Sequence, residues 1–371
     1  MHAFRRTTTL ILICGGLILT LSLGIRQSFG LFLQPMTAEF GWGRETFAFA
    51  IALQNLVWGA AQPFSGMIAD RFGVGRVLAG GAALYALGLV LMALSSTGVE
   101  LALSAGLLLG LGLSGTSYGV VFGVIGRTFA PERRALALGV ASAAGSFGQF
   151  AMIPYGHALI SSFGWYASLI ILAGTAALMA PLASALAEGP EYEAPQRGGQ
   201  SISHALGEAL KHKGFWLLCW GFLVCGFQTL FIAVHLPAFL LDRGMPAHTA
   251  MTALALIGLF NVFGSFLCSY LGGRYTKKNL LSMIYLLRAV LIAAFITLPM
   301  SPLTVYVFAA AMGLFWLGTV PLTNGVVAQI FGVRYLATLF GIVFLFHQVG
   351  SFLGIWAGGY LYDLTKSYEL I

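Results

Sequence analysis

Residues 66–96 read GMIADRFGVGRVLAGGAALYALGLVLMALSS, and this stretch decides the class of fold. Three charged residues, Asp70, Arg71 and Arg76, come before twenty residues that carry no charge. Such a stretch has about the length of a helix that crosses the hydrocarbon core of a bilayer. The same alternation runs through all 371 residues, of which 58% are hydrophobic and 8% charged, whereas soluble domains carry about 25% charged residues. The sequence therefore predicts an all-α membrane protein and excludes a water-soluble domain.

Clusters of charged residues, Pro and Gly divide the chain into eleven predicted spanning helices. One long polar stretch lies between the sixth and the seventh of them, and it ends in a short amphipathic run. We therefore expect an N-terminal six-helix bundle over residues 1–187, a cytoplasmic linker over 188–213 and a C-terminal bundle of five helices over 214–371. The eleven helices are expected at residues 8–35, 44–69, 77–96, 100–126, 134–160, 166–187, 214–241, 247–272, 279–298, 302–330 and 335–362.

The basic residues predict the orientation of the chain. With a cytoplasmic N-terminus, fourteen Lys and Arg residues lie at interior helix ends and three at exterior ends, which is a strong positive-inside bias. The basic residues occur singly and in pairs, without the patch that a nucleic-acid partner would need. We expect a multi-pass protein of the cell inner membrane, surrounded by lipid, monomeric, with its N-terminus in the cytoplasm and without a nucleic-acid partner.

The two halves of the chain repeat each other in the same orientation. Asp70-Arg71 corresponds to Gly273-Arg274 at an offset of 203, Phe129 and Gly139 correspond to Phe331 and Gly341 at an offset of 202, and Gly145-Ser146-Phe147 resembles Gly350-Ser351-Phe352. Parallel repeats of this kind are typical of one class of secondary transporters. By this offset a twelfth helix would lie beyond residue 371. A truncated sequence and a naturally shortened chain are both open explanations.

The segment from Gly66 to Arg76 resembles the loop signature of the major facilitator superfamily, G-x-x-x-D-R-x-G followed by basic residues, between helices two and three. Gly66 permits a close helix contact, Asp70 can accept hydrogen bonds, and Arg71 and Arg76 hold the loop in the cytoplasm. The resemblance implies a secondary transporter whose two helical bundles alternate access to a central site, with helices one, four, seven and ten lining the cavity.

A second segment resembles the start of helix five in the monocarboxylate transporter family, and it is similar to the bacterial branch of that family. The residues are Phe129-Ala-Pro-Glu-Arg133-Arg134-Ala-Leu-Ala-Leu-Gly-Val-Ala-Ser-Ala143, against the pattern aromatic-x-x-x-R-R-x-L-A-x-G-x-A-x-A. The chain departs from the family in two helices. Helix one has Gly15 and Gly16 without the usual acid and Trp, and in helix eight Asn261 is followed one turn later by Ser265 where many members carry Arg.

Polar side chains inside the predicted helices are the candidate site residues, because ionised groups in hydrocarbon are costly. The candidates for binding substrate are Arg26, Tyr118, His235, Asn261 and Arg288, and the candidates for coupling a proton are His235 and His347. Each has a structural alternative, such as snorkelling to the interface or hydrogen bonding between helices. The gating candidates from the two signature segments are Gly66, Asp70, Arg71, Arg76, Arg133 and Arg134.

Other chemistry finds no support in the sequence. The four cysteines lie inside apolar segments without a His or acidic residue beside them, so they are expected to be small core residues. No G-x-x-x-x-G-K-[ST] loop for ATP is present. No Ser, Cys or His spacing suggests a nucleophile with a base, or a metal site. We expect neither an enzyme nor a bound cofactor.

The favoured function is secondary active transport of a small organic anion, similar to a monocarboxylate, with or without a proton. One alternative is an exporter of amphiphilic or aromatic compounds, suggested by 13% aromatic residues but weakened by the lack of an acidic residue in the middle of any predicted helix. The other alternative is a membrane sensor that keeps the fold without transporting anything.

Overall fold

The computed structural model describes residues 8–187, 202–332 and 336–368, apart from the side chains of residues 70–71, 126–127, 131–132, 134–136, 202 and 336–338. All regular structure within these ranges is helical. Nine helical stretches of this part of the chain are long and apolar enough to cross a membrane. The prediction of an all-α membrane protein is therefore confirmed.

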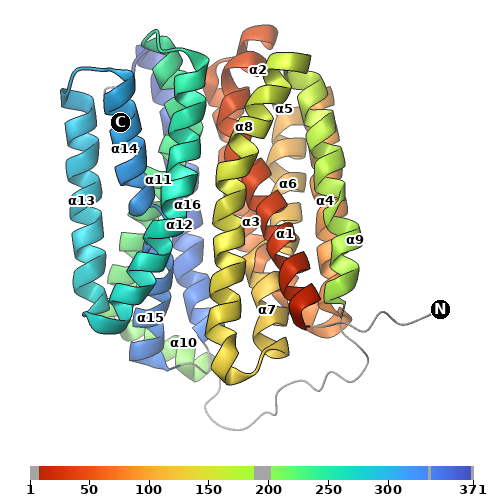
Figure 1. Ribbon diagram of the computed structural model, residues 1–371, viewed down its shortest axis with the longest axis vertical. Coiled ribbons are helices and arrows are strands. Elements are labelled where there is room, and N and C mark those ends of the chain that lie inside the picture. Colours follow the sequence, from red (N-terminus) through yellow and green to blue (C-terminus); the bar gives the residue numbers. More distant parts are fainter. Residues whose placement is uncertain (1–7, 188–201, 333–335, 369–371) are drawn as a thin grey trace. The chain divides into compact units, whose positions relative to one another are not determined.

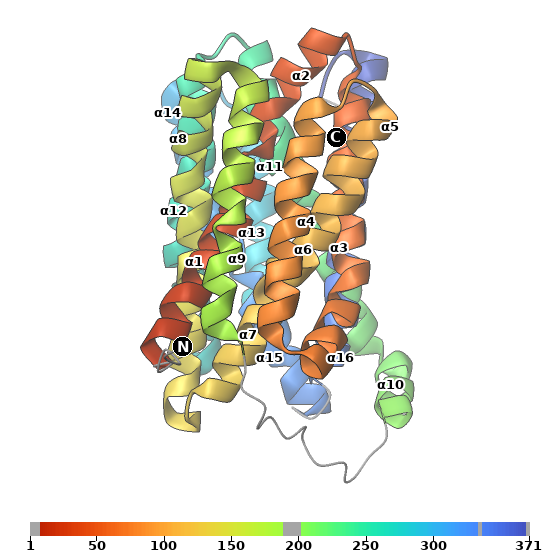
Figure 2. The same ribbon diagram turned by 90° about the vertical axis from the view of Figure 1, so that its right-hand side faces the viewer.

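The chain divides into two compact units, unit 1 (Met1–Ala194) and unit 2 (Pro195–Ile371). The division falls within the predicted linker, residues 188–213, of which residues 188–201 lie outside the described part. The rest of that stretch contains α10 (Ile202–Lys211), a short helix that Figure 2 shows at one end of unit 2. The predicted bounds of the two bundles stay a prediction.

Unit 1 is a bundle of long helices that lie side by side (Figure 1). Ser117 interrupts one of them with an extended backbone, φ −96° and ψ −174°. In chain order the elements are α1 (Thr8–Gln27), η1 (Ser28–Phe32), α2 (Leu33–Phe40), α3 (Arg44–Phe72), α4 (Val74–Leu94), α5 (Gly98–Leu101), η2 (Ala102–Leu108), α6 (Leu109–Thr116), α7 (Tyr118–Thr128), α8 (Pro131–Ala177), α9 (Met179–Ala183) and η3 (Ser184–Leu186).

Unit 2 is a second helical bundle, and it has a similar interruption. Residues 315–318 separate α14 (Pro302–Leu314) from α15 (Thr319–Phe331), so the helix predicted at 302–330 is broken. After α10 the elements are α11 (Lys213–Asp242), α12 (Ala247–Arg274), α13 (Lys277–Thr297), α14 (Pro302–Leu314), α15 (Thr319–Phe331) and α16 (Leu336–Thr365).

Two differences separate the nine apolar stretches from the eleven predicted helices. The stretch Ala137–Leu186 contains Gly164 with φ 76°, a conformation that glycine adopts readily, and this turn lies between the helices predicted at 134–160 and 166–187. The other difference is α3, which is helical across its predicted range but carries polar Gln54, Asn55 and Gln62. The nine stretches alone do not establish the division into six and five helices.

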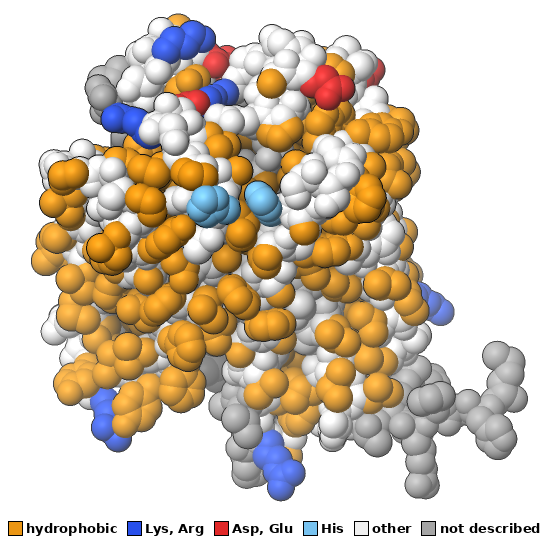
Figure 3. Space-filling model, turned by 45° about the horizontal axis from the view of Figure 1, so that its top comes forward, with side chains coloured by type: hydrophobic (Ala, Val, Ile, Leu, Met, Phe, Trp, Pro, Cys, Tyr) orange, Lys and Arg blue, Asp and Glu red, His pale blue; other side chains and the backbone are white. Residues whose placement is uncertain are grey.

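The surface suits a hydrocarbon environment. Hydrophobic side chains cover the flank of the helices in Figure 3, and charged side chains gather towards the helix ends. Leu217, Phe266 and Ile296 are each at least 70% exposed. Large exposed apolar surfaces of this kind are rare in soluble monomers, whereas lipid chains solvate them in a membrane.

Glycine permits the closest helix contact in each unit. A Cβ atom on Gly148 of α8 would lie 2.7 Å from the carbonyl carbon of Thr20 in α1, and a Cβ atom on Gly350 of α16 would lie 2.7 Å from that of Leu223 in α11. In a membrane the hydrophobic effect does not drive helices together, so helix association depends on close packing. Small residues allow the backbones of two helices to approach closely. The two contacts are equivalent, because Thr20 and Leu223 are 203 residues apart and Gly148 and Gly350 are 202 apart.

A second pair of contacts supports the repeat. A Cβ atom on Gly110 would lie 2.8 Å from the carbonyl oxygen of Gln54, and one on Gly313 would lie 2.7 Å from that of Ile257, with both residues shifted by 203. The two units thus pack the same positions together.

The packing also corrects one detail of the sequence comparison. Gly350 takes the place of Gly148, so the resemblance of Gly145-Ser146-Phe147 to Gly350-Ser351-Phe352 is three residues out of register. Helix contacts decide the register because three residues make almost one helical turn, and a short sequence match cannot distinguish neighbouring turns.

Candidate functional site

Arg26 lies near the end of α1, inside unit 1, and its partners are neutral. Its Nη2 donates to Oδ1 of Asn55 in α3, and its guanidinium lies 5.0 Å from the ring centroid of Trp58. Its Nε is buried without a partner among the described residues. The site therefore holds a cation, an amide oxygen and an aromatic face, which is a combination that suits an anionic ligand.

A line of polar side chains continues from this site along one face of α3. Asn55, Trp58, Gln62 and Ser65 recur at helical spacing. Nε1 of Trp58 lies 2.8 Å from Oε1 of Gln62 and 3.0 Å from Oγ of Ser117. Oγ of Ser117 in turn donates to the same Gln62 oxygen at 2.8 Å. The interruption between α6 and α7 is thus stabilised by side chains of α3.

Tyr118 begins α7, directly after this interruption, but its hydroxyl points elsewhere. A Cβ atom on Gly145 of α8 would lie 2.7 Å from that hydroxyl oxygen, and Ser142 and Ser146 are its hydrogen-bonding neighbours. Tyr118 therefore contacts α8, and no contact with Arg26 is recorded in the described part of unit 1.

Asn261 and Arg288 meet at the interruption of unit 2. Oδ1 of Asn261 accepts a hydrogen bond from the backbone N–H of Leu317 at 3.0 Å. Nε of Arg288 donates to the carbonyl of Phe315 at 3.0 Å, and Nη2 donates to the carbonyls of Phe315 and Trp316. A broken helix leaves backbone groups without helical partners, and these two side chains supply them.

Every nitrogen of the Arg288 guanidinium has an acceptor within unit 2, since Nη1 donates to the sulfur of Cys225 at 3.1 Å. The side chain is fully buried. The structural alternative for Arg288 therefore accounts for all of these contacts, and its role in binding substrate stays a prediction.

The two candidate histidines differ in their surroundings. Nε2 of His235 lies 2.8 Å from the carbonyl oxygen of Ile355, and Nδ1 lies 3.1 Å from the hydroxyl of Tyr368. Nδ1 of His347 lies 3.1 Å from Oε1 of Gln348, but its Nε2 is buried without a hydrogen-bond partner in the described ranges. Nε2 of His347 is therefore available to accept a proton. Both nitrogens of His235, by contrast, lie within hydrogen-bonding distance of neighbouring groups.

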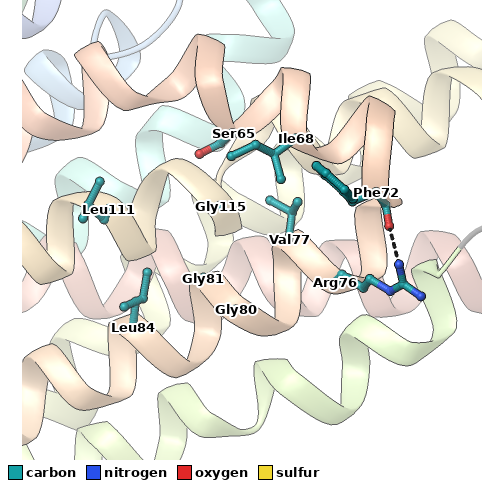
Figure 4. A pocket seen from close by; sticks show the side chains of 10 residues that line it. All are labelled: Ser65, Ile68, Phe72, Arg76, Val77, Gly80, Gly81, Leu84, Leu111 and Gly115. Atoms are coloured by element: carbon teal, nitrogen blue, oxygen red, sulfur yellow. Dashed lines mark hydrogen bonds between the residues drawn. The ribbon is translucent and has the colours of Figure 1, made fainter.

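The loop signature borders a groove of about 270 Å³ on the surface of unit 1. Figure 4 shows Arg76 at the rim, where Nη1 donates to the carbonyl of Phe72 at 3.4 Å. Nothing lies within 4 Å of a Cβ atom placed on Gly66, so the close helix contact expected there is not made within unit 1. The role of Gly66 therefore stays a prediction. Arg133 is exposed near the start of α8, and the side chains of Asp70, Arg71 and Arg134 lie outside the described residues.

The sequence did not single out Cys225. All four cysteines are buried and free, as expected for core residues. Cys225 has polar contacts in addition, because its sulfur accepts a hydrogen bond from Arg288 and interacts with His347. No histidine stands beside a cysteine in the sequence, and residues 225 and 347 meet only through the packing of α11 against α16. Asn55 and Trp58 were missed for the same reason. The repeat could have signalled Trp58, because Trp58 occupies the place of Asn261, 203 residues later, whereas Asn55 corresponds to Gly258 and carried no such signal.

The chain matches the family model of the Major Facilitator Superfamily over residues 12–355. The chain therefore belongs to the Major Facilitator Superfamily. Together with its fold and relatives, this makes it a multi-pass membrane transporter and not an enzyme.

Two relatives show the range of the similarity. The uncharacterized MFS-type transporter YcxA of Bacillus subtilis (strain 168) is 28% identical over 366 residues, which cover 93% of this chain and 86% of the relative. Monocarboxylate transporter 11 of Homo sapiens is 26% identical over 359 residues, which cover 94% of this chain and 75% of the relative.

Among solved structures, a bacterial homologue of the human lysosomal transporter Spinster, in its inward-facing and unoccupied conformation, is similar with a TM-score of 0.79. The match covers 98% of this chain and 84% of that chain at 18% sequence identity. At this identity the similarity shows the fold alone. The family model and the sequence relatives, in contrast, confirm the predicted resemblance to the superfamily and to the monocarboxylate transporter family.

Proposed function

We propose that the protein moves a small organic anion of the monocarboxylate class across the cytoplasmic membrane, together with a proton, by alternating access of its two units. Arg26 is the group that we assign to the carboxylate. The observation that carries this assignment is a cation inside α1 whose neighbours Asn55, Trp58 and Tyr85 are all neutral side chains.

Charge balance supports the assignment. Arg26 lies within the apolar stretch Thr8–Phe40, and an Arg at the centre of a spanning helix costs about 2.5–3.5 kcal/mol on insertion scales. An amide oxygen and an aromatic ring stabilise the guanidinium without neutralising it. A bound carboxylate would supply the missing negative charge, and the planar fork of Arg suits it because both oxygens can accept hydrogen bonds at once.

The relatives support the class of substrate. Several that align over most of this chain are monocarboxylate transporters by name. Their identity to this chain is 26%, so they favour a carboxylate without specifying which one. Asn261 and Tyr118 remain proposed as further substrate contacts, reached as the units move.

The proton is assigned to histidine because no Asp or Glu lies in the middle of a predicted span. Of the two candidates, the structure favours His347, whose Nε2 is buried without a partner. Imidazole titrates near neutral pH and can carry one proton per anion. Such symport leaves the charge of the loaded site unchanged.

The location and orientation are proposals from the charge pattern. An N-terminus in the cytoplasm and a bacterial-type inner membrane are supported by fourteen basic residues at one set of helix ends against three at the other. We propose a monomer, because each unit has its own buried core and unit 2 contains continuous hydrophobic clusters of its own.

The test is uptake of radiolabelled short-chain monocarboxylates into liposomes that contain the purified protein. We expect Arg26→Ala nearly to abolish uptake, and Arg26→Lys to reduce it, because a point charge replaces the bidentate fork. Losing charge-assisted hydrogen bonds costs about 1.5–3 kcal/mol, which is roughly tenfold to more than a hundredfold in affinity.

The matched control is Arg274→Lys. Arg274 also lies over an aromatic ring, 4.4 Å from the centroid of Tyr270, but it is exposed at the end of α12. Uptake should be unchanged in this variant. Failure of the folded, unmutated protein to transport any monocarboxylate would refute the substrate class. Normal affinity in Arg26→Ala would refute the role of Arg26.

A further inference from the structure

One contact between three helices occurs in both units, but its chemistry differs. In unit 1, Oγ of Ser22 lies 2.8 Å from Oγ1 of Thr116, and the hydroxyl of Tyr85 donates to the Ser22 carbonyl at 2.9 Å. Each of these three positions has a counterpart in unit 2 at an offset of 203, namely Cys225, Thr319 and Arg288. The neutral cluster of unit 1 is therefore an ionisable cluster in unit 2.

The first property of the unit 2 cluster is an unbalanced charge. Arg288 is fully buried, and its acceptors are two backbone carbonyls and the Cys225 sulfur. No carboxylate is among the partners recorded for it in the described part of unit 2. A buried charge is normally paired with an opposite charge, and Cys225 is the only one of these acceptors that can become an anion.

The second property is the number of polar groups around the Cys225 sulfur. Nη1 of Arg288 donates to it at 3.1 Å, and Oγ1 of Thr319 lies 3.3 Å away. The side chains of Tyr285 and His347 interact with it as well. A neutral thiol is a weak acceptor, whereas a thiolate can accept hydrogen bonds from the guanidinium of Arg288 and from the hydroxyl of Thr319 at once.

These groups come from three of the helices around α11. Arg288 and Tyr285 belong to α13, Thr319 to α15 and His347 to α16. From α12, Cys268 faces Arg288. No acidic group is among the residues recorded at this sulfur in the described chain.

The third property is a place for a proton to arrive. Nε2 of His347 is buried without a hydrogen-bond partner, and the side chain as a whole is 6% exposed. An imidazole beside a sulfur can accept a proton and pass it on.

We propose that Cys225 is a thiolate that neutralises Arg288, and that Cys225 and His347 together form the proton-carrying site of unit 2, in the place that a carboxylate would otherwise take. This inference rests on the proposed proton-coupled function. A proton binds His347 at Nε2. The N–H bond then breaks as an S–H bond forms on Cys225, and the imidazole returns to its neutral form.

No electron is transferred in this step, and its consequence is a change of charge. The cluster goes from neutral to a net charge of plus one, because the thiol no longer neutralises Arg288. A buried net positive charge favours binding of an anion. Loss of the proton on the other side of the membrane restores the thiolate and favours release of the anion. Proton and monocarboxylate thereby move together.

Infrared spectroscopy tests the thiolate directly, through the S–H stretching band. The protein to measure is the full chain with Cys14→Ala, Cys219→Ala and Cys268→Ala, which leaves Cys225 as its one thiol. We expect no S–H band at neutral pH and a band that grows on acidification. A matched chain that keeps only Cys219, which is buried on the same helix, should show the band at neutral pH. A full S–H band from Cys225 at neutral pH would overturn the proposal.

Transport tests the coupling. Cys225→Ser places in unit 2 the residue that unit 1 has at Ser22, so the contact with Thr319 is kept and the ionisable group is lost. We expect this variant to lose the stimulation of uptake by an inward proton gradient, and Cys219→Ser to keep it. Stimulated uptake in Cys225→Ser would overturn the assignment of the proton. Absence of any monocarboxylate uptake in the unmutated protein would instead refute the proposed function, while the infrared spectrum would still decide whether Cys225 is a thiolate.

Discussion

Two substitutions on the same helix test whether glycine holds α11 and α16 together. Gly350→Ala and Gly341→Ala make the same chemical change in α16, but their surroundings differ. A Cβ atom at residue 350 would lie 2.7 Å from the carbonyl carbon of Leu223, and nothing lies within 4 Å of one at residue 341. Ordinary contact begins at 3.4 Å, so α11 and α16 must separate by at least 0.7 Å in Gly350→Ala.

The magnitude follows from packing. A gap of about 0.5–1 Å forfeits a quarter to a half of the van der Waals attraction across a contact, and overpacking a buried site typically costs about 1–3 kcal/mol. Replacing Gly by Ala inside a helix favours the helix by up to about 1 kcal/mol. Gly341→Ala should therefore raise or preserve stability, whereas Gly350→Ala should be less stable than Gly341→Ala by about 1–3 kcal/mol.

Thermal unfolding in detergent, followed by tryptophan fluorescence, measures the difference. For a domain of the size of unit 2 each kcal/mol corresponds to about 2–4 °C in Tm, so Gly350→Ala should melt about 2–12 °C below Gly341→Ala. Equal Tm values for the two variants would refute the reasoning, because helix propensity alone predicts the same effect at both positions.

Further predictions concern the second unit, the break in α14–α15, coupling and orientation. Gly148→Ala should lower Tm relative to Gly139→Ala by a similar amount, because it repeats the test in unit 1; an effect confined to unit 2 would contradict the equivalence of the units. Asn261→Leu removes the acceptor of the Leu317 N–H and should cost about 1–3 kcal/mol in unfolding experiments, whereas Ser265→Ala, which removes only a donor to Asn261, should cost about 0.6 kcal/mol. An inward proton gradient should stimulate carboxylate uptake in liposomes, and His347→Gln should reduce this stimulation more than His235→Gln does; indifference of the unmutated protein to the gradient would indicate a uniporter or an anion exchanger. A membrane-impermeant maleimide should label Arg243→Cys in intact cells and leave Lys211→Cys unlabelled until the membrane is opened; the reverse pattern would show that the orientation is inverted.

The sequence alone predicted the class of fold and the repeat. Apolar stretches of membrane-crossing length identify spanning helices, because a backbone in hydrocarbon must satisfy its own hydrogen bonds. The turn at Gly164 lies between two predicted segments, whereas the interruptions at Ser117 and at residues 315–318 were not predicted. The offset of 203 residues between the halves holds for the buried pairs of Gly110 and Gly313. These features depend on composition along the chain, which a sequence displays directly.

The surroundings of the polar side chains were decided by the tertiary structure. A helix that is apolar on all sides carries no stripe to show which face meets its neighbours, so the sequence could name Arg26 and Arg288 as buried cations but not their partners. Asn55 is 29 residues from Arg26, and Cys225 is 63 residues from Arg288. Only the packing of whole helices brings these groups together, because hydrogen bonds require contact within about 3 Å. Cys225, which reads as a small core residue in the sequence, becomes a partner of Arg288 and His347 for that reason.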